Sequence, residues 1–226
     1  MVKDKHFKLA GSKDAVGEIL AGKIRAKLEA GQRVVWVVSG GSTIQIAVRA
    51  AEILRDTDIS NLTVGLADER YGAPGHPDSN WHQLQAAGFE LPGANIITVL
   101  DGRQAAEAAE SYGRKIDQLL INSDYRVGLL GMGADGHTAG IMPHSPALVS
   151  ASAAIVYGYS DYIRITLTTK TLAKLDEIFL YAAGDEKRTA IDNLASDKPA
   201  PDEQPAQLVK RVPVWTVYND HIGEAL

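Results

Sequence analysis

A glycine-rich loop past the middle of the chain constrains the fold more than any other stretch. The apolar run at 127–130 predicts a buried strand, and glycines at 131, 133 and 136 follow it directly. Glycines let backbone N–H groups approach a ligand, because no Cβ is in the way. Open α/β sheets bind their ligands at the carboxyl ends of strands. Asp135 and His137 therefore stand where a carboxylate and an imidazole can form an acid–base site.

The same glycines match the Gly-x-Gly-x-x-Gly spacing of dinucleotide-binding proteins. That fingerprint needs a long helix that begins at the third glycine and holds a pyrophosphate at its N-terminus. Pro143 comes seven residues after Gly136, which leaves room for about two helical turns at most. No acidic residue stands at the spacing that the ribose contact requires. The sequence therefore argues against a nicotinamide cofactor.

Composition excludes several classes of function. The chain of 226 residues has no cysteine, which rules out disulfides, thiolate zinc sites and thiol nucleophiles. A net charge of −5 without a block of basic residues argues against a nucleic-acid surface. The N-terminus lacks an apolar leader and no apolar run is long enough to span a bilayer. We expect a cytoplasmic protein, a monomer or small homo-oligomer, without membrane or nucleic-acid partners.

Strands and helices alternate along the whole chain. Apolar runs predict strands at 34–38, 62–67, 95–99, 127–130, 153–157, 162–167, 177–183 and 212–217, and residues 5–10 could form a short edge strand. Helical spacing follows Ser12 as far as Gly31, and recurs at 44–54, at 104–120 and through residues 191 and 194. Residues 196–205 are expected to form a loop. This order predicts one three-layer α/β domain over residues 1–226, with a mostly parallel central sheet flanked by helices.

A second polar loop follows the strand at 34–38. Its sequence is Ser-Gly-Gly-Ser-Thr, and a helical run begins at residue 44. Free N–H groups, the helix dipole and hydroxyl donors converge at such a point and can hold a phosphate. A tight turn capped by one of the hydroxyls is the alternative. The candidate phosphate-binding residues are Gly40, Gly41, Ser42 and Thr43.

Other polar residues allow two interpretations each. Asp68-Glu69-Arg70 directly follows a buried strand, so it is either a solvated turn or part of a site. The long loop behind it contains His76, Asp78 and His82, which could ligate a metal, although a solvated loop with helix-capping residues fits better. We therefore expect no metal site.

Two basic residues stand later in the chain. Arg164 lies within the strand at 162–167, where an outward-facing arginine on an edge strand is the simpler interpretation. Lys187 begins a helix and so opposes the helix dipole, and a bound phosphate would remove that cost.

Five motifs in this order resemble the 6-phosphogluconolactonase family, whose superfamily also contains glucosamine-6-phosphate deaminase/isomerase. They are Ser-Gly-Gly-Ser-Thr at 39–43, Asp-Glu-Arg at 68–70 with Asp-Ser-Asn at 78–80, Gly-Met-Gly-Ala-Asp-Gly-His-Thr-Ala at 131–139, Arg-Ile-Thr-Leu-Thr at 164–168, and Gly-x-x-Lys at 184–187. The resemblance covers about residues 12–218. It implies a Rossmann-like domain that hydrolyses a phosphorylated sugar lactone in the pentose phosphate pathway without a required cofactor.

The resemblance leaves a deaminase as the alternative. Deaminases carry a glutamate five residues after the motif histidine, where this chain has Met142. They also tend to have an aromatic residue in place of Arg70. Both differences favour a lactonase. A non-catalytic sugar-phosphate-binding regulator is a third possibility, but it would not need both Asp135 and His137.

Some positions depart from the lactonase pattern. Ile44 stands where proline is common, Gly140 where serine is usual, and Met142 where phenylalanine is usual. Residues 157–162 lack the Lys-Pro element that often precedes the Arg-Ile-Thr strand. These changes affect the substrate rim more than the chemistry.

Hydrolysis of a lactone requires an activated water, a stabilised oxyanion and a proton for the leaving alkoxide. We expect His137 to be the general base, with Asp135 or Asp68 orienting either the imidazole or the water. Arg70 is the candidate for the oxyanion. The phosphate is assigned to the loop of residues 40–43 together with Arg164 and Lys187.

Overall fold

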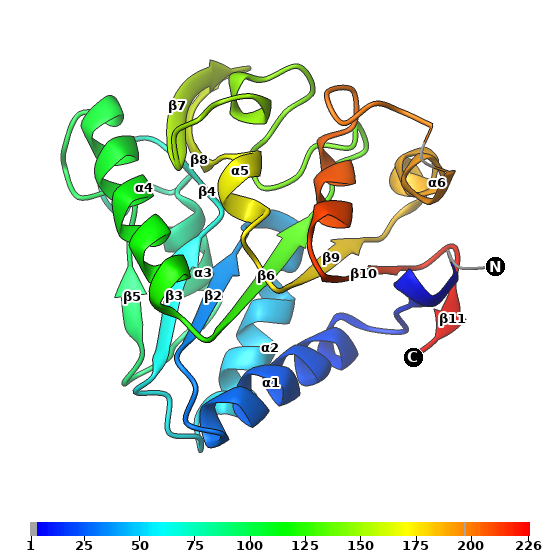
Figure 1. The fold of residues 1–226 in the computed structure, drawn as a ribbon, viewed down its shortest axis with the longest axis horizontal. Helices are drawn as coiled ribbons and strands as arrows, with labels where there is room; N and C mark the ends of the chain where they lie inside the picture. Colours follow the sequence, from blue (N-terminus) through cyan, green and yellow to red (C-terminus); the bar gives the residue numbers. More distant parts are fainter. Residues whose placement is uncertain (1–3, 197) are drawn as a thin grey trace.

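The computed structural model describes residues 4–196 and 198–226, so position 197 of the loop expected at 196–205 lies outside the described residues. An eight-stranded sheet of parallel strands runs through the middle of this part of the chain (Figure 1). Its strands are β1 (Phe7–Leu9), β2 (Val34–Val38), β3 (Leu62–Leu66), β5 (Asn95–Ile97), β6 (Tyr125–Gly131), β9 (Glu177–Ala182), β10 (Val214–Asn219) and β11 (Glu224–Ala225). Their order is β11-β1-β10-β9-β6-β2-β3-β5. The predicted fold class is confirmed.

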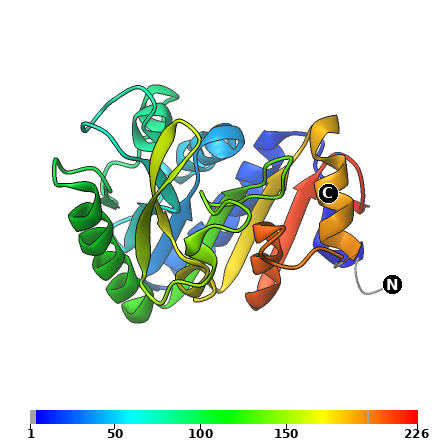
Figure 2. The same ribbon diagram turned by 90° about the horizontal axis from the view of Figure 1, so that it is seen from above.

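The central strands are apolar because both faces of the sheet are covered. Every residue of β2 and of β9 is buried, as expected for a parallel sheet between two helical layers. The helices are α1 (Lys13–Glu29), α2 (Ile44–Leu54), α3 (Asn80–Ala86), α4 (Ala105–Asn122), α5 (Thr169–Leu172) and α6 (Arg188–Ser196). Helices α1 and α2 pack together on one face, and α4 covers the other (Figure 2).

Helix ends follow the capping signals in the sequence. The Ser12 side chain accepts a hydrogen bond from the N–H of Ala15 at the start of α1, and Ser79 accepts one from His82 at the start of α3. Gly31, just beyond α1, has a φ of 73°, which suits glycine. Short 3₁₀ helices complete the chain: η1 (Asp4–His6), η2 (Gly41–Thr43), η3 (Pro146–Leu148), η4 (Asp185–Lys187) and η5 (Pro205–Arg211).

A second, antiparallel sheet lies over the carboxyl ends of the central strands (Figures 1 and 2). It consists of β4 (Asp68–Arg70), β8 (Tyr162–Leu167) and β7 (Ala154–Tyr159), in that order. The alternative that residues 68–70 form a solvated turn is therefore wrong: they form a strand, and Glu69 within it is fully buried.

Two further details differ from the sequence-based expectations. The last long strand begins at Val214, two residues later than expected, and lies between β1 and β9. The edge beyond β1 is formed by β11, which is too short to be recognised from its sequence pattern.

The strand order reverses between β2 and β6. From β2 the chain continues to β3 on one side, whereas from β6 it continues to β9 on the other side. The loops that leave these two adjacent strands therefore diverge and open a crevice at their carboxyl ends, where α/β sheets bind ligands.

Candidate active site

A cavity of about 250 Å³ opens at this crevice, and eight of the ten predicted site residues line it. The loop after β2 contributes Gly40, Gly41 and Ser42. The small sheet contributes Asp68, Arg70 and Arg164, the loop after β6 contributes His137, and the end of η4 contributes Lys187. Segments far apart in the sequence thus meet at one pocket.

His137 is held by Asp135, which lies outside the cavity lining. Oδ1 of Asp135 lies 2.5 Å from Nδ1 of His137 and also accepts the backbone N–H of His137 at 3.1 Å. The ring packs on Gly133, where a Cβ would lie 2.2 Å from Cε1 of His137, so only glycine fits there.

No helix begins at Gly136: residues 132–145, all described, form turns and short bridges. The dinucleotide-binding alternative therefore lacks its helix.

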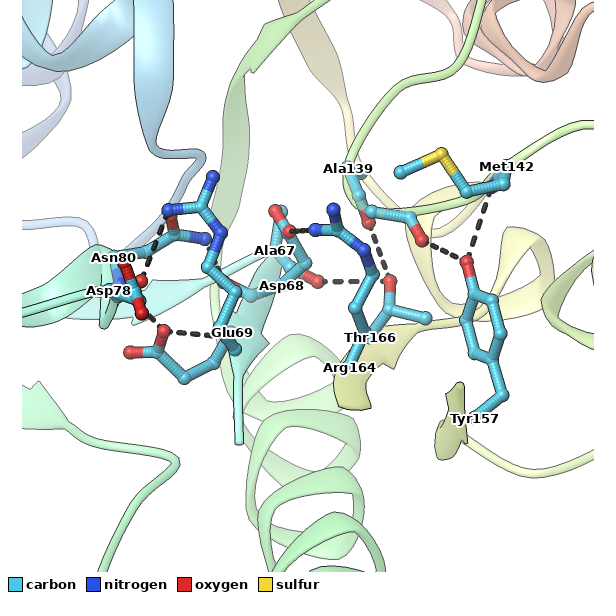
Figure 3. A network of polar contacts seen from close by, with 12 residues as sticks. Ala67, Asp68, Glu69, Asp78, Asn80, Ala139, Met142, Tyr157, Arg164 and Thr166 are labelled. Carbon is cyan, nitrogen blue, oxygen red and sulfur yellow. Dashed lines mark hydrogen bonds and ion pairs between the residues drawn. The ribbon is translucent and has the colours of Figure 1, made fainter. Parts of the chain in front are cut away.

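The pairing of β4 with β8 arranges the charges of the pocket. Asp68 lies opposite Thr166 and Arg70 opposite Arg164, so these side chains share one face of the small sheet. Oδ2 of Asp68 lies 3.7 Å from Nη1 of Arg164 (Figure 3). Burial raises the pKa of Asp68, and the positive charges of the two arginines only partly oppose that rise.

Glu69 points to the opposite side of β4 and has a structural role. It accepts hydrogen bonds from the Ser79 hydroxyl at 2.8 Å and from the backbone N–H groups of Asn80 at 2.6 Å and Trp81 at 3.1 Å. These donors belong to the beginning of α3, where a carboxylate is favoured by the helix dipole. Burial raises the pKa of Glu69 nonetheless. Glu69 therefore fixes α3 against the small sheet and lies outside the pocket.

A tight turn at residues 138–141 forms one wall of the pocket. Ala139 and Gly140 both have positive φ values, 53° and 66°, and the N–H of Ile141 donates to the carbonyl of Thr138 at 2.7 Å. A Cβ on Gly140 would lie 2.5 Å from the Cβ of Asp68, so this turn packs directly on the pocket carboxylate.

Two side chains that the sequence reasoning missed anchor this turn. The Thr166 hydroxyl donates to the carbonyl of Ala139 at 2.5 Å (Figure 3). The Tyr157 hydroxyl donates to the carbonyl of Gly140 and accepts the N–H of Met142 at 3.2 Å. Both residues come from the small sheet, and nothing in their local sequence indicates these contacts.

The phosphate candidates divide into two groups. Ser42 lines the cavity, whereas the buried Thr43 hydroxyl donates to the carbonyls of Ser39 at 2.8 Å and Gly40 at 3.1 Å, so it shapes the loop. Neither hydroxyl makes a capping bond to α2. The ammonium group of Lys187 has no hydrogen bond or ion pair with another described residue, and burial lowers the pKa of Lys187.

The pocket contains polar atoms without partners. Among the described residues, Ser39 Oγ, Arg70 Nε, Asn80 Oδ1 and Arg164 Nε are buried and have no hydrogen-bond partner. All four residues line the cavity. Buried polar groups are normally satisfied, so this pattern indicates a site built for a polar ligand. Ser39 and Asn80 were not among the predicted site residues.

The histidines and the aspartate of the long loop, considered above as an alternative metal site, do not form a metal-binding group. Nε2 of His76 lies 2.9 Å from the carbonyl oxygen of Arg70. Across residues 4–196 and 198–226, no group of three or more histidine or acidic side chains is placed to hold a metal ion. In the same part of the chain, no helix has both the length and the apolar character needed to cross a membrane.

Comparison with known proteins agrees with this geometry. Residues 10–217 match the family model described as glucosamine-6-phosphate isomerases/6-phosphogluconolactonase. A 6-phosphogluconolactonase of Nostoc sp. is 32% identical over 77% of this chain and 76% of its own length. One of Synechocystis sp. is 30% identical over 63% of this chain, and the match spans 64% of that relative.

Solved structures have the same fold. The crystal structure of a 6-phosphogluconolactonase from Thermotoga maritima superimposes with a TM-score of 0.79 at 25% identity, over 93% of this chain and 97% of that one. Sequence and fold thus agree over nearly the whole described chain. The chain belongs to the glucosamine-6-phosphate isomerase/6-phosphogluconolactonase family.

Proposed function

We infer that the protein hydrolyses 6-phospho-D-glucono-1,5-lactone to 6-phosphogluconate in the oxidative branch of the pentose phosphate pathway. The observation that carries this inference is the His137–Asp135 pair at a pocket where four buried polar side-chain atoms, including Nε of Arg70 and Nε of Arg164, have no hydrogen-bond partner. A base and an anion site side by side fit the hydrolysis of a phosphorylated ester. The names of the relatives from Nostoc and Synechocystis support the same activity.

The reaction follows from the orientation of His137. Nδ1 of His137 is hydrogen-bonded to Asp135, so Nε2 is the nitrogen available to remove a proton from water. The oxygen of that water attacks the lactone carbonyl carbon, and the carbonyl oxygen becomes an oxyanion, which we assign to Arg70. When the ring C–O bond breaks, the protonated imidazole returns its proton to the alkoxide. We propose that Asp68 orients the water, since it lines the cavity while Asp135 does not.

The substrate phosphate is assigned to the loop after β2 together with Arg164 and Lys187. The backbone at Gly40 and Gly41, the Ser42 hydroxyl, Arg164 and Lys187 supply donors and positive charge. Each charged contact contributes about 1.5–3 kcal/mol. A phosphate held in this way would fix the ring for attack by the activated water. Thr43 contributes by shaping the loop.

The alternative activities are less well supported. Ring opening by a deaminase would use a glutamate at position 142, and Met142 there is apolar, buried and bonded through its backbone to Tyr157. A non-catalytic regulator would bind the phosphate but would not need the Asp135–His137 pair.

We further propose a single cytoplasmic domain over residues 1–226, active without a cofactor as a monomer or small homo-oligomer. Size-exclusion chromatography coupled to light scattering tests the oligomeric state.

The decisive experiment is lactone hydrolysis at neutral pH by wild type and by His137→Ala. Freshly prepared 6-phosphogluconolactone is the substrate, and the spontaneous rate is subtracted. We expect the variant to lose at least about 100-fold of the acceleration. His144→Ala is the matched control, because this exposed histidine also lies near a carboxylate but not at the pocket.

Other results would change the assignment. Activity that survives His137→Ala would move the base to another group, with Asp68 the next candidate. A wild-type protein that does not accelerate hydrolysis would contradict the proposed function, and turnover of glucosamine 6-phosphate would then be measured.

A further inference from the structure

Tyr162, the first residue of β8, contacts both arginines of the pocket. The guanidinium carbon of Arg70 lies 5.4 Å from the centre of the Tyr162 ring, and that of Arg164 lies 5.5 Å from it. Cations within about 6 Å of an aromatic ring centre are attracted by the ring quadrupole. One ring therefore holds two guanidinium groups.

This arrangement compensates for an unfavourable pairing. Arg70 and Arg164 are direct neighbours across the β4–β8 ladder, and like charges in such positions repel each other. Among the described residues that line the pocket, Asp68 is the only carboxylate; it lies 3.7 Å from Arg164, and burial raises its pKa. The described contacts thus leave the two positive charges incompletely neutralised.

The two arginines also keep unused donors. Arg70 donates through Nη1 to the carbonyl of Asp78 at 3.1 Å, while Nε of Arg70 and Nε of Arg164 are both buried without a partner. A carboxylate counterion would consume such N–H groups, whereas an aromatic ring attracts a guanidinium without accepting its N–H donors in this way. The ring can therefore hold the arginines and leave their donors to a ligand.

We propose that Tyr162 is a positioning residue that holds Arg70 and Arg164 as a pair of guanidinium groups for the anionic oxygens of the substrate. The proposal rests on the proposed function, because it names the groups that hold the substrate in that site. Tyr162 itself does not line the cavity, so it acts through the two arginines.

Three variants test this role. Tyr162→Leu removes the ring quadrupole, and Tyr162→Phe keeps it while removing the hydroxyl. Tyr159→Leu is the matched control, because Tyr159 is the cross-strand partner of Tyr162 on the same hairpin and has no described contact with either arginine. The dissociation constant of inorganic phosphate, from calorimetry, and kcat/KM for the lactone are measured for each protein.

We expect Tyr162→Leu to weaken phosphate binding through Arg164 and to lower kcat/KM through both arginines, each by about tenfold, which is the size expected when partly desolvated cation–π contacts are lost. Tyr162→Phe and Tyr159→Leu should stay within about twofold of wild type, since both keep the two cation–π contacts. Thermal unfolding checks each fold, and Tyr162→Met replaces the leucine variant if that variant does not fold.

Several outcomes would overturn the proposal. Wild-type behaviour of Tyr162→Leu, equal losses in the leucine and phenylalanine variants, or an equal loss in Tyr159→Leu would each show that the ring does not position the arginines. A wild-type protein that binds no phosphate would also overturn the proposal, because the two arginines would then hold no anion. Phosphate binding needs no turnover, so a failed lactonase assay with intact ring-dependent phosphate binding would contradict the proposed function alone.

Discussion

Oδ1 of Asp135 lies 2.5 Å from Nδ1 of His137, and both residues belong to one glycine-rich loop. Because an ionised carboxylate only accepts hydrogen bonds, this contact places the ring proton on Nδ1 and leaves Nε2 basic. The same carboxylate oxygen also accepts the backbone N–H of His137. The side chain and the backbone of the proposed base are thus fixed by a single group.

The first prediction concerns Asp135→Asn. The amide can present its NH₂ group to Nδ1 and so favour the wrong tautomer, and we expect kcat to fall about 100-fold while KM changes less than about threefold. Steady-state kinetics measure both constants. Asp202→Asn is the control, because Oδ2 of Asp202 lies 3.8 Å from Nδ1 of the exposed His144. An Asp135→Asn enzyme with wild-type kcat would show that another group orients the imidazole.

The second prediction concerns the turn on Asp68. Gly140→Ala adds a Cβ to a residue whose backbone is in the left-handed region, and this Cβ would lie 2.5 Å from the Cβ of Asp68. The variant should therefore have both a lower free energy of unfolding and a lower kcat. Gly102→Ala shares the backbone cost of about 1–2 kcal/mol, since its φ is 85°, but its Cβ would meet nothing within 4 Å.

Denaturation and kinetics together separate the two effects. The Gly102 variant should lose stability and keep full kcat, whereas the Gly140 variant should lose both. Equal kcat in the two variants would show that contact between the turn and Asp68 does not matter for activity.

Much of the fold could be predicted because local signals agree with the tertiary structure. The predicted helix 44–54 and strand 34–38 are observed with these bounds. The two polar loops follow adjacent strands, and the parallel arrangement brings their ends to one edge of the sheet. That is why residues 40–42 and His137 could be placed in one site before the strand order was known.

The remaining features depend on contacts between distant segments. A three-residue strand of charged residues, Asp68–Arg70, has no apolar pattern, and only its pairing with β8 makes it a strand. The anchoring roles of Tyr157, Thr166 and Tyr162 arise from the same small sheet. Tyr162 and Arg70, for example, lie 92 positions apart along the chain, so no local periodicity can reveal such contacts.

The third prediction uses the raised pKa of Asp68. In the unfolded chain this carboxyl ionises near its ordinary value of about 3.9, whereas burial keeps it protonated to higher pH in the folded protein. Between these two values the folded state binds more protons, so the contribution of Asp68 to stability is lost as pH rises through the folded-state pKa. Asp68→Asn should therefore gain stability relative to wild type as pH rises.

Urea denaturation from about pH 4 to about pH 8 measures this difference. Asp58→Asn should behave in the opposite way, because the N–H of Ser60 lowers the pKa of the exposed Asp58. Wild type should then gain relative to this variant as pH rises. A pH-independent difference for Asp68→Asn would contradict the burial argument.

The final prediction separates the two hydroxyls of the loop after β2. Ser42 lines the cavity, so Ser42→Ala should raise KM about tenfold, the value of one hydrogen bond to a charged phosphate, with little effect on unfolding. The Thr43 hydroxyl instead donates to the carbonyls of Ser39 and Gly40, so Thr43→Val should lower the free energy of unfolding by about 1–2 kcal/mol. Kinetics and urea denaturation of both variants give the comparison. If Ser42→Ala lost stability and kept its KM, this loop would be a structural turn, and the phosphate would have to be held by Arg164 and Lys187 alone.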